Sequence, residues 1–462
     1  MKTSRSKNII FLTVLTGILL IFSYCQKQEP EPDDLLDRLN ALDGVSAIEI
    51  DPHYGYPRAF QIDFEQPVDH SNPGGAKFMQ RIYLSHSNEE TPMIFSPSGY
   101  GSQASSVQEL AGIMQTNHLS VVHRYFVEAE PAAMDWSYLT VRQAADDHHR
   151  IVCTFKKIYK DKWISSGVSK GGLTSLFHKR FYPDDVDATL AYVSPIEFGT
   201  SDSRFVEYLE NIGSPECRAD ILDFQRNCLQ ERDSILPRIE KWLKENNYEI
   251  SGNLEAVFES EVRSYDWTFW QYHTYDCSQI PGMEASYDEM ALHLIDVTKL
   301  YRSTDYWEYF FRPYVYQAFT EIGYPERNYD RLADLLKFDP DSLFQKDLEY
   351  YVIPVVYNPA TIMDINYWLI NYGKNIIYLY GSIDPWSGGE IALEGKTNAL
   401  KIMQEGGDHL IKIADLDERD LVLQTLGGWL GMDITYVEYK GIRIDEIQEK
   451  NYLETDMSLA RR

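Results

Sequence analysis

The segment around Ser169 has the residue types and spacing of a nucleophilic serine. The pattern Gly167-x-Ser169-x-Gly171 follows a strand-like stretch, residues 162–166, and leads into a helix-like one. In a tight strand-to-helix turn a serine hydroxyl projects above a parallel sheet, and glycines are needed where neighbouring backbones approach closely. The pattern therefore predicts Ser169 as a nucleophile. A Gly-rich structural turn is the alternative interpretation.

A serine hydroxyl is a poor nucleophile without a general base, and the base needs an acid that orients it. Asp384 lies on the loop after the strand-like residues 376–380, and His409 follows the next such stretch, residues 399–403. Ser, Asp, His is the chain order expected when the serine occupies such a turn. We therefore predict Ser169, Asp384 and His409 as a catalytic triad.

Other residues compete for two of these roles. Asp364 and Asp408 are alternative acids in the same part of the chain, and His409 could be a histidine of a surface turn. His273 and His293 also follow the serine, but they fall in a segment without strand character. The order of elements thus favours His409 as the base.

Acyl transfer also needs backbone N–H groups that stabilise the oxyanion. One should be the N–H of Lys170, the residue after the nucleophile, and a second should come from the loop after an early strand. Residues 99–101, Gly-Tyr-Gly, follow the strand-like residues 93–96, so we predict Tyr100 as the second donor. A plain β-turn is the alternative for this loop.

The elements that must position these residues alternate between strand and helix, which predicts βαβ units on a largely parallel sheet. Strand-like segments are residues 48–84 (several short ones), 93–96, 119–126, 162–166, 186–193, 376–380 and 399–403, and helix-like ones are 138–159, 167–179 and 416–430. Residues 197–350 instead suggest aromatic-rich helices, and the α/β pattern resumes at 351–353. The predicted fold class is therefore α/β, an α/β-hydrolase core with an inserted, mainly helical cap.

The predicted domain boundaries follow from this pattern. They are a signal peptide at 1–24, an acidic tether at 25–50, the first part of the core at 51–196, the cap at 197–350 and the second part of the core at 351–462.

The composition excludes several classes of partner. The chain has 43 Lys and Arg against 71 Asp and Glu, a net charge of -28, and 44% of its residues are hydrophobic. So acidic a surface argues against a nucleic-acid partner and against an anionic membrane surface. The apolar fraction excludes a disordered chain.

The N-terminus has the layout of an export signal. Basic residues precede an apolar run at residues 9–22, which is short for a membrane span, and Cys25 follows before an acidic stretch. This order resembles a bacterial lipoprotein signal with Cys25 as the lipidated residue, although Tyr24 is larger than the residue usual there. We predict an exported cell-envelope lipoprotein (periplasm or outer-membrane/cell surface) that touches the membrane only through its lipid anchor. Soluble secretion and an uncleaved anchor are the alternatives.

The cysteines suggest neither a disulfide scaffold nor a metal site. Cys217 and Cys228 fall on one predicted helix, and eleven residues at 1.5 Å per residue separate them by about 16 Å, too far to bond each other. No zinc-binding spacing and no Gly-rich phosphate cradle is found. We predict no metal and no cofactor.

Several motifs resemble the secreted bacterial tripeptidyl/prolyl aminopeptidase family of serine peptidases. The matching blocks are residues 64–70, 80–81, 123–126, 135–140, 143–145, 162–165, 169–172 and 180–187. The resemblance implies an α/β-hydrolase core with a helical cap, and release of short peptides from free N-termini, often after proline. The catalytic Ser, Asp and His of the family carry over to Ser169, Asp384 and His409. Val122 and residues 194–197 depart from the family pattern.

An exopeptidase of this kind needs a group that binds the N-terminal ammonium of an oligopeptide, and a carboxylate in the cap would serve. Glu321 lies among aromatic residues, so we predict it as this substrate-binding residue; a solvated glutamate at a helix end is the alternative. Aromatic residues of the cap could line a proline pocket, or they could pack its core; these are Trp267, Trp270, Tyr309 and Tyr316.

Two other functions stay open. A carboxylesterase on the same scaffold would cleave acyl esters and accept a blocked amine. A catalytically silent surface lipoprotein that binds peptides or glycans would need no triad, and the order of Ser169, Asp384 and His409 counts against it.

Overall fold

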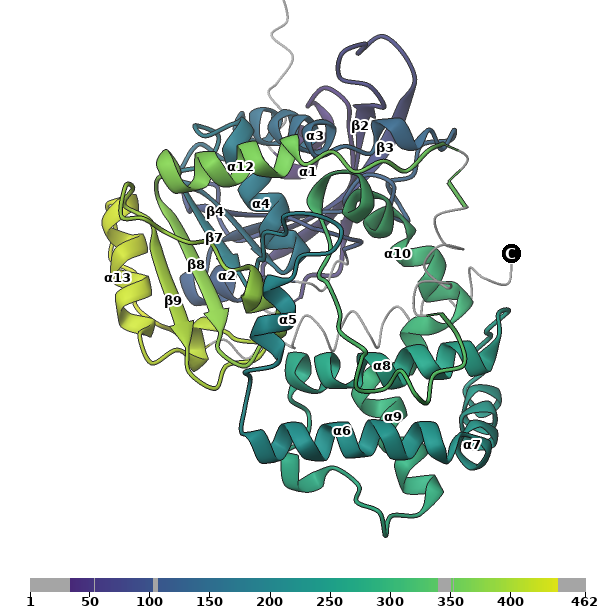
Figure 1. The fold of residues 1–462 in the computed structure, drawn as a ribbon. Coiled ribbons are helices and arrows are strands. Elements are labelled where there is room, and N and C mark those ends of the chain that lie inside the picture. The colour runs from purple at the N-terminus through teal and green to yellow at the C-terminus, as the bar shows by residue number, and fades with distance from the viewer. Residues whose placement is uncertain (1–33, 54, 103–106, 340–349, 352, 439–462) are drawn as a thin grey trace, which may run out of the picture.

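A nine-stranded sheet forms the centre of the molecule (Figure 1). The computed structural model describes residues 34–53, 55–102, 107–339, 350–351 and 353–438. The strands lie in the order β1-β2-β3-β5-β4-β6-β7-β8-β9. Their bounds are β1 Val45–Ile50, β2 Arg58–Pro67, β3 Lys77–His86, β4 Met93–Pro97, β5 Asn117–Val121, β6 Trp163–Val168, β7 Ala188–Tyr192, β8 Ile376–Gly381 and β9 Leu400–Gln404.

The sheet is antiparallel at one side and parallel over the rest. β1, β2, β3 and β5 pair antiparallel in turn, and from β5 onward each strand is parallel to the next in the order β5, β4, β6, β7, β8 and β9. Every residue of β4, β7 and β8 is buried, as expected for parallel strands that are covered on both faces. This architecture confirms the predicted fold class.

Helices cover both faces of the sheet. On one face α2 (Glu109–Met114) and α13 (Arg419–Leu430) share a hydrophobic cluster with β6, β7 and β8. On the other face lie α3 (Val141–Phe155), α4 (Lys170–Phe181) and α12 (Ala360–Asn371). The carboxyl ends of β6, β8 and β9 therefore lead to loops at one edge of the layer, where a site can form.

A helical region is inserted between β7 and β8. Its main helices are α5 Arg204–Leu209, α6 Pro215–Gln230, α7 Arg232–Glu245, α8 Leu254–Tyr272, α9 Tyr287–Thr298 and α10 Asp305–Gln317. In Figure 1, α6 to α9 form a layer below the sheet, and they enclose a hydrophobic cluster of their own. A disulfide joins Cys217 on α6 to Cys277, with 5.4 Å between the Cα atoms. Cys217 and Cys228 lie on the same helix, as predicted.

One predicted boundary is wrong. Residues 35–50 are not a tether, because Leu35–Asn40 form helix α1 and β1 pairs with β2. Residues 353–358 are in neither helix nor strand, and the side chain of Tyr351 packs against Trp136 and Tyr316. The predicted signal peptide and Cys25 lie outside the described residues. Among the described residues, no helix is both long and apolar enough to cross a membrane.

Candidate active site

Ser169 occupies a strained turn between β6 and α4. Its backbone has φ 55° and ψ -126°, a conformation that costs energy for a residue other than glycine. A Cβ atom at Gly167 would lie 2.3 Å from the carbonyl oxygen of Gly171, and one at Gly172 would lie 1.8 Å from Ser194 Oγ. At Gly171 the nearest atom would be 3.5 Å away. The turn therefore requires glycine at 167 and 172, and not at 171 as the motif suggested.

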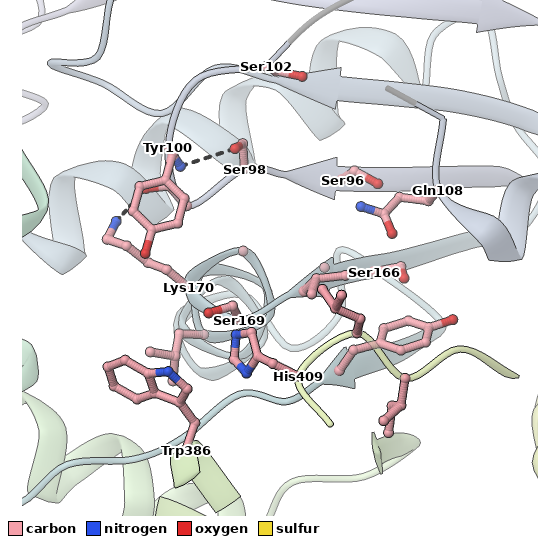
Figure 2. A pocket seen from close by; sticks show the side chains of 18 of the residues that line it. Ser96, Ser98, Tyr100, Ser102, Gln108, Ser166, Ser169, Lys170, Trp386 and His409 are labelled. Atoms are coloured by element: carbon pink, nitrogen blue, oxygen red, sulfur yellow. Dashed lines mark hydrogen bonds between the residues drawn. The ribbon is translucent and has the colours of Figure 1, made fainter. Parts of the chain in front are cut away.

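Asp384 and His409 meet beside this serine. Asp384 follows β8, is fully buried, and accepts a hydrogen bond from the N–H of Trp386 at 3.1 Å. Its Oδ2 lies 2.7 Å from Nδ1 of His409. The imidazole lies next to Ser169 in Figure 2, and both residues line the same cavity. A carboxylate on Nδ1 leaves Nε2 to accept the serine proton.

The competing residues have other partners. Asp364 forms a salt bridge with Arg180 at 3.0 Å, and Asp408 accepts a hydrogen bond from the N–H of Leu410 at 2.8 Å. His293 lies 2.9 Å from the hydroxyl of Tyr265 inside the cap. The structure therefore brings together Ser169, Asp384 and His409, and none of their rivals.

The end of α8 contacts the loops that carry the acid and the base. The N–H of His409 donates a hydrogen bond to the carbonyl of Gln271 at 3.0 Å. The ring of Trp267 packs at 85° against Trp386, two residues after Asp384, with 4.9 Å between centroids. The cap thus supports the catalytic loops, and no local pattern in the sequence could have indicated this long-range contact.

The oxyanion prediction is half supported by the geometry. Lys170 is the first residue of α4, so its N–H has no acceptor within the helix. Its Nζ donates to the carbonyl of Gly99 at 2.7 Å, and burial lowers the pKa of this amine to about 7. The N–H of Tyr100, however, donates to Ser98 Oγ at 3.0 Å (Figure 2). Tyr100 is therefore not the free second donor that we predicted.

The prediction that Glu321 faces the active site is wrong. Its Oε2 accepts the N–H of Val141 at 2.7 Å, and its Oε1 accepts the hydroxyl of Thr361 at 3.1 Å. Glu321 does not line the cavity at Ser169. It instead stabilises the start of α3, where the helix has unpaired N–H groups.

The cavity at Ser169 measures about 570 Å³ and has two sides of different character. In Figure 2, Ser96, Gln108 and Ser166 lie on one side of Ser169, and Tyr100 and Trp386 lie on the other. The ring of Tyr100 on the second side packs against Phe311 and Tyr314, and other aromatic residues of the lining are Trp307, Phe310, Tyr324 and Trp386. A cavity of this size suits a ligand of a few residues.

The aromatic lining comes from other residues than those predicted. The cavity is lined by rings of α10, and Trp267, Trp270, Tyr309 and Tyr316 do not reach it. The sequence placed many rings in the cap, but only the packing of the helices decides which of them face the cavity.

One group of possible metal ligands occurs among the described residues, outside the cavity. His149, Cys153 and Asp185 lie within 4.8 Å of one another through their ligand atoms. Asp185 already pairs with His149 at 2.8 Å and with His178 at 2.9 Å. These contacts account for the cluster, and we assign no metal to it.

Comparison with known proteins identifies the family of the chain. A family model described as PS-10 peptidase S37 matches residues 28–432. The chain belongs to this peptidase family. The S37 chain is 35% identical over 414 residues to a prolyl tri/tetrapeptidyl aminopeptidase of Streptomyces mobaraensis, covering 86% of this chain and 85% of that protein. The protein is therefore a serine peptidase, as the resemblance in its motifs implied.

Solved structures similar to this S37 chain are more distant. A proline iminopeptidase of Mycobacterium smegmatis is 12% identical, with a TM-score of 0.35, over 80% of this chain and 98% of its own. A proline iminopeptidase-related protein of Thermus thermophilus is 11% identical, with a TM-score of 0.38, over 80% and 99%. The fold is therefore assigned from the order and direction of the strands in the sheet.

Proposed function

We propose that this protein is an exported serine exopeptidase that releases tripeptides, preferably after proline, from the free N-termini of oligopeptides. The observation that carries the proposal is the buried contact of 2.7 Å between Asp384 and His409, beside the strained turn of Ser169. This arrangement has the three parts that activate a serine hydroxyl.

The mechanism follows from the geometry. Ser169 Oγ attacks the scissile carbonyl while His409 takes its proton, and Asp384 stabilises the imidazolium. The N–H of Lys170 stabilises the oxyanion at the start of α4, where the helix dipole adds to the effect. His409 then protonates the leaving amine. A water molecule, deprotonated by the same imidazole, attacks the acyl-enzyme and regenerates Ser169 with release of the peptide acid.

The cap supports an oligopeptide substrate. Helices α8 and α10 contribute Gln271, Tyr272 and Phe310 to the lining of the cavity that contains Ser169. A cavity roofed in this way admits a short flexible chain and excludes a folded protein. The S. mobaraensis relative is named a prolyl tri/tetrapeptidyl aminopeptidase, and this name supports the proposed substrate class.

A panel of three matched substrates tests the proposal. The purified protein is incubated with Ala-Ala-Pro-p-nitroanilide, its N-acetylated form and a p-nitrophenyl ester, with Ser169→Ala as the control. Rapid cleavage of the free-amine peptide, lost in the control, is the expected result. Ester turnover without peptide cleavage would make the protein a carboxylesterase, and inactivity on a wide panel would favour a binding lipoprotein.

We also propose that the protein is held in the cell envelope through a lipid on Cys25. The basic and apolar residues before Cys25 support export. The disulfide between Cys217 and Cys277 fits an oxidising compartment. Mass spectrometry of the N-terminal peptide from membranes should find acylated Cys25, and Cys25→Ser should move the protein to the soluble fraction. An unmodified Cys25 in membrane-bound protein would contradict the proposal.

A further inference from the structure

Glu197 is a buried carboxyl group with an unused oxygen in the wall of the catalytic cavity. It is 3% exposed, and it lines the same cavity as Ser169 and His409. Among the described residues, no hydrogen-bond partner lies within reach of its Oε2. A buried polar atom without a partner is costly, and such atoms in native proteins call for a ligand or another explanation.

The segment that carries Glu197 is held in place. It follows β7, the neighbour of the strand that leads to Ser169. The N–H of Ile196 donates to the carbonyl of Gly389 at 2.8 Å, and the N–H of Phe198 donates to Asp202 at 2.8 Å. A Cβ atom at Gly323 would lie 2.6 Å from Cβ of Glu197, so the end of the cap packs tightly on this residue. The carboxyl group is therefore fixed before any ligand arrives.

Aromatic rings share the cavity with the carboxyl group, and the cations Lys170 and Arg302 line it too. Tyr100, Tyr314 and Tyr324 line the cavity with it, and after burial the charge of Glu197 is among the causes that raise the pKa of each of these phenols. The faces of such rings attract a cation. The nearby Arg204 is paired with Asp202 at 2.7 Å, and Glu197 forms no salt bridge with any described residue.

We propose that Glu197 and the surrounding tyrosines bind the N-terminal ammonium group of the substrate. The site has two features that recognise an ammonium ion in a buried cavity: one carboxylate oxygen free to accept, and aromatic rings in the same lining. The inference rests on the proposed function, since it names the group that makes the peptidase an exopeptidase.

The protonation of Glu197 agrees with this role. Burial raises the pKa of its carboxyl group well above the usual range, with a further contribution from Asp202 that Arg204 opposes. The empty site thus favours the neutral acid. An ammonium group in the site favours the carboxylate, so binding of the free amine couples to ionisation of Glu197.

The test compares Glu197→Gln with the wild-type protein on free and N-acetylated Ala-Ala-Pro-p-nitroanilide and on the p-nitrophenyl ester. Loss of one partner of a buried charge pair predicts a fall of about 100-fold in the ratio of kcat/KM for the free over the acetylated peptide. Ester turnover should change less than threefold, because the triad is intact. Glu321→Gln is the matched control, a cap glutamate outside the cavity, and should keep the wild-type ratio.

The outcomes separate the two proposals. An unchanged ratio in Glu197→Gln, or an equal loss on all three substrates, overturns the role of Glu197 while the peptidase stands. If the wild-type protein cleaves the ester and neither peptide, the peptidase proposal itself fails.

A second measurement needs no variant. Propylamine should inhibit cleavage of the free-amine Ala-Ala-Pro-p-nitroanilide by the wild-type protein competitively at pH 8, whereas propanol, of nearly the same shape, should not. Equal inhibition by the two compounds, or none by either, would remove the ammonium site.

Discussion

The two sides of the cavity differ in how their polar groups are paired: the core side is formed by the loops after β6, β8 and β9, and the cap side by the inserted region with α8 and α10. On the core side, every polar group of the proposed triad has a defined place: the acid is buried against the base, and the serine stands in a turn that only glycine neighbours permit. On the cap side, rings of α10 line the cavity, and Tyr314 of α10 shares it with Glu197, whose carboxyl group has an unused oxygen. The difference suggests that the core carries the chemistry and the cap selects the substrate.

The two sides are nevertheless joined. The carbonyl of Gln271 on α8 accepts the N–H of His409, and Trp267 packs on Trp386 beside the acid. A shift of the cap is therefore expected to disturb the base as well as the substrate. Substitutions on each side of the cavity should show whether the catalytic step and the choice of substrate can be changed independently.

The largest effect is expected from the base on the core side. His409→Ala should lower kcat by about 10⁴-fold for the peptide and the ester alike, because both reactions use the same proton transfer. Steady-state kinetics on the two substrates measures this loss. His273→Ala, in the cap and outside the cavity, is the control and should retain activity. If kcat of His409→Ala were within tenfold of the wild-type value, His409 would not be the catalytic base.

The disulfide tests the cap alone. Replacing Cys217 and Cys277 by serine should lower the free energy of unfolding by about 4 kcal/mol, since the bond closes a loop of 60 residues. Urea unfolding followed by fluorescence measures this change, with Cys153→Ser as a control for an exposed thiol. Ester turnover at 25 °C should stay within threefold of the wild type. Its loss would mean that the cap cannot be separated from the catalytic side.

The turn at Ser169 offers a matched pair of glycines on the core side. Gly172→Ala should destabilise the protein by about 3 kcal/mol, because its Cβ would meet Ser194 Oγ at 1.8 Å. Gly171→Ala should be close to the wild type, with 3.5 Å to its nearest atom. Urea midpoints of the two variants provide the measurement. The reverse order of stability would show that the motif glycine, and not its neighbour, sets the turn.

The smallest effect concerns the buried amine of Lys170. Burial lowers its pKa to about 7, so above this pH the folded protein releases a proton that the unfolded chain keeps up to its own pKa of about 10.4. Stability therefore rises with pH in this window. Between pH 7 and pH 8.5 the free energy of unfolding of the wild type should rise by about 1.5 kcal/mol relative to that of Lys170→Met. Urea unfolding at both pH values measures the difference, and a constant difference would contradict it.

The core could be predicted from the sequence because its signals are local. The strand, the turn and the helix around Ser169 are contiguous, and the positions of Asp384 and His409 follow from short apolar strands just before them. The strand β1 could not be predicted in this way. It is short, it has a single buried residue, Ala47, and only its pairing with β2, from Val45 with Phe64 to Ile50 with Ala59, makes it part of the sheet.

The sequence could not predict which carboxyl group faces the cavity, because the packing of the folded chain decides which groups are buried and which have partners. Glu321 and Glu197 both lie near aromatic residues in the sequence, but one has both oxygens bonded to α3 and α12, and the other has an oxygen without a partner. The pairing of Cys217 with Cys277 likewise depends on how α6 packs. Contacts between residues that are far apart in the sequence have no characteristic spacing, so no sequence pattern predicts them.

In the proposed reaction, Ser169 is activated by His409 and attacks the carbonyl of a peptide with a free N-terminus. The most direct test is a diphenyl phosphonate analogue of Ala-Ala-Pro, with a free or acetylated amine, followed by mass spectrometry of the modified peptide. The account predicts an adduct on Ser169, formed faster with the free amine and absent in His409→Ala. An adduct on another residue, or equal labelling of the His409→Ala variant, would contradict it.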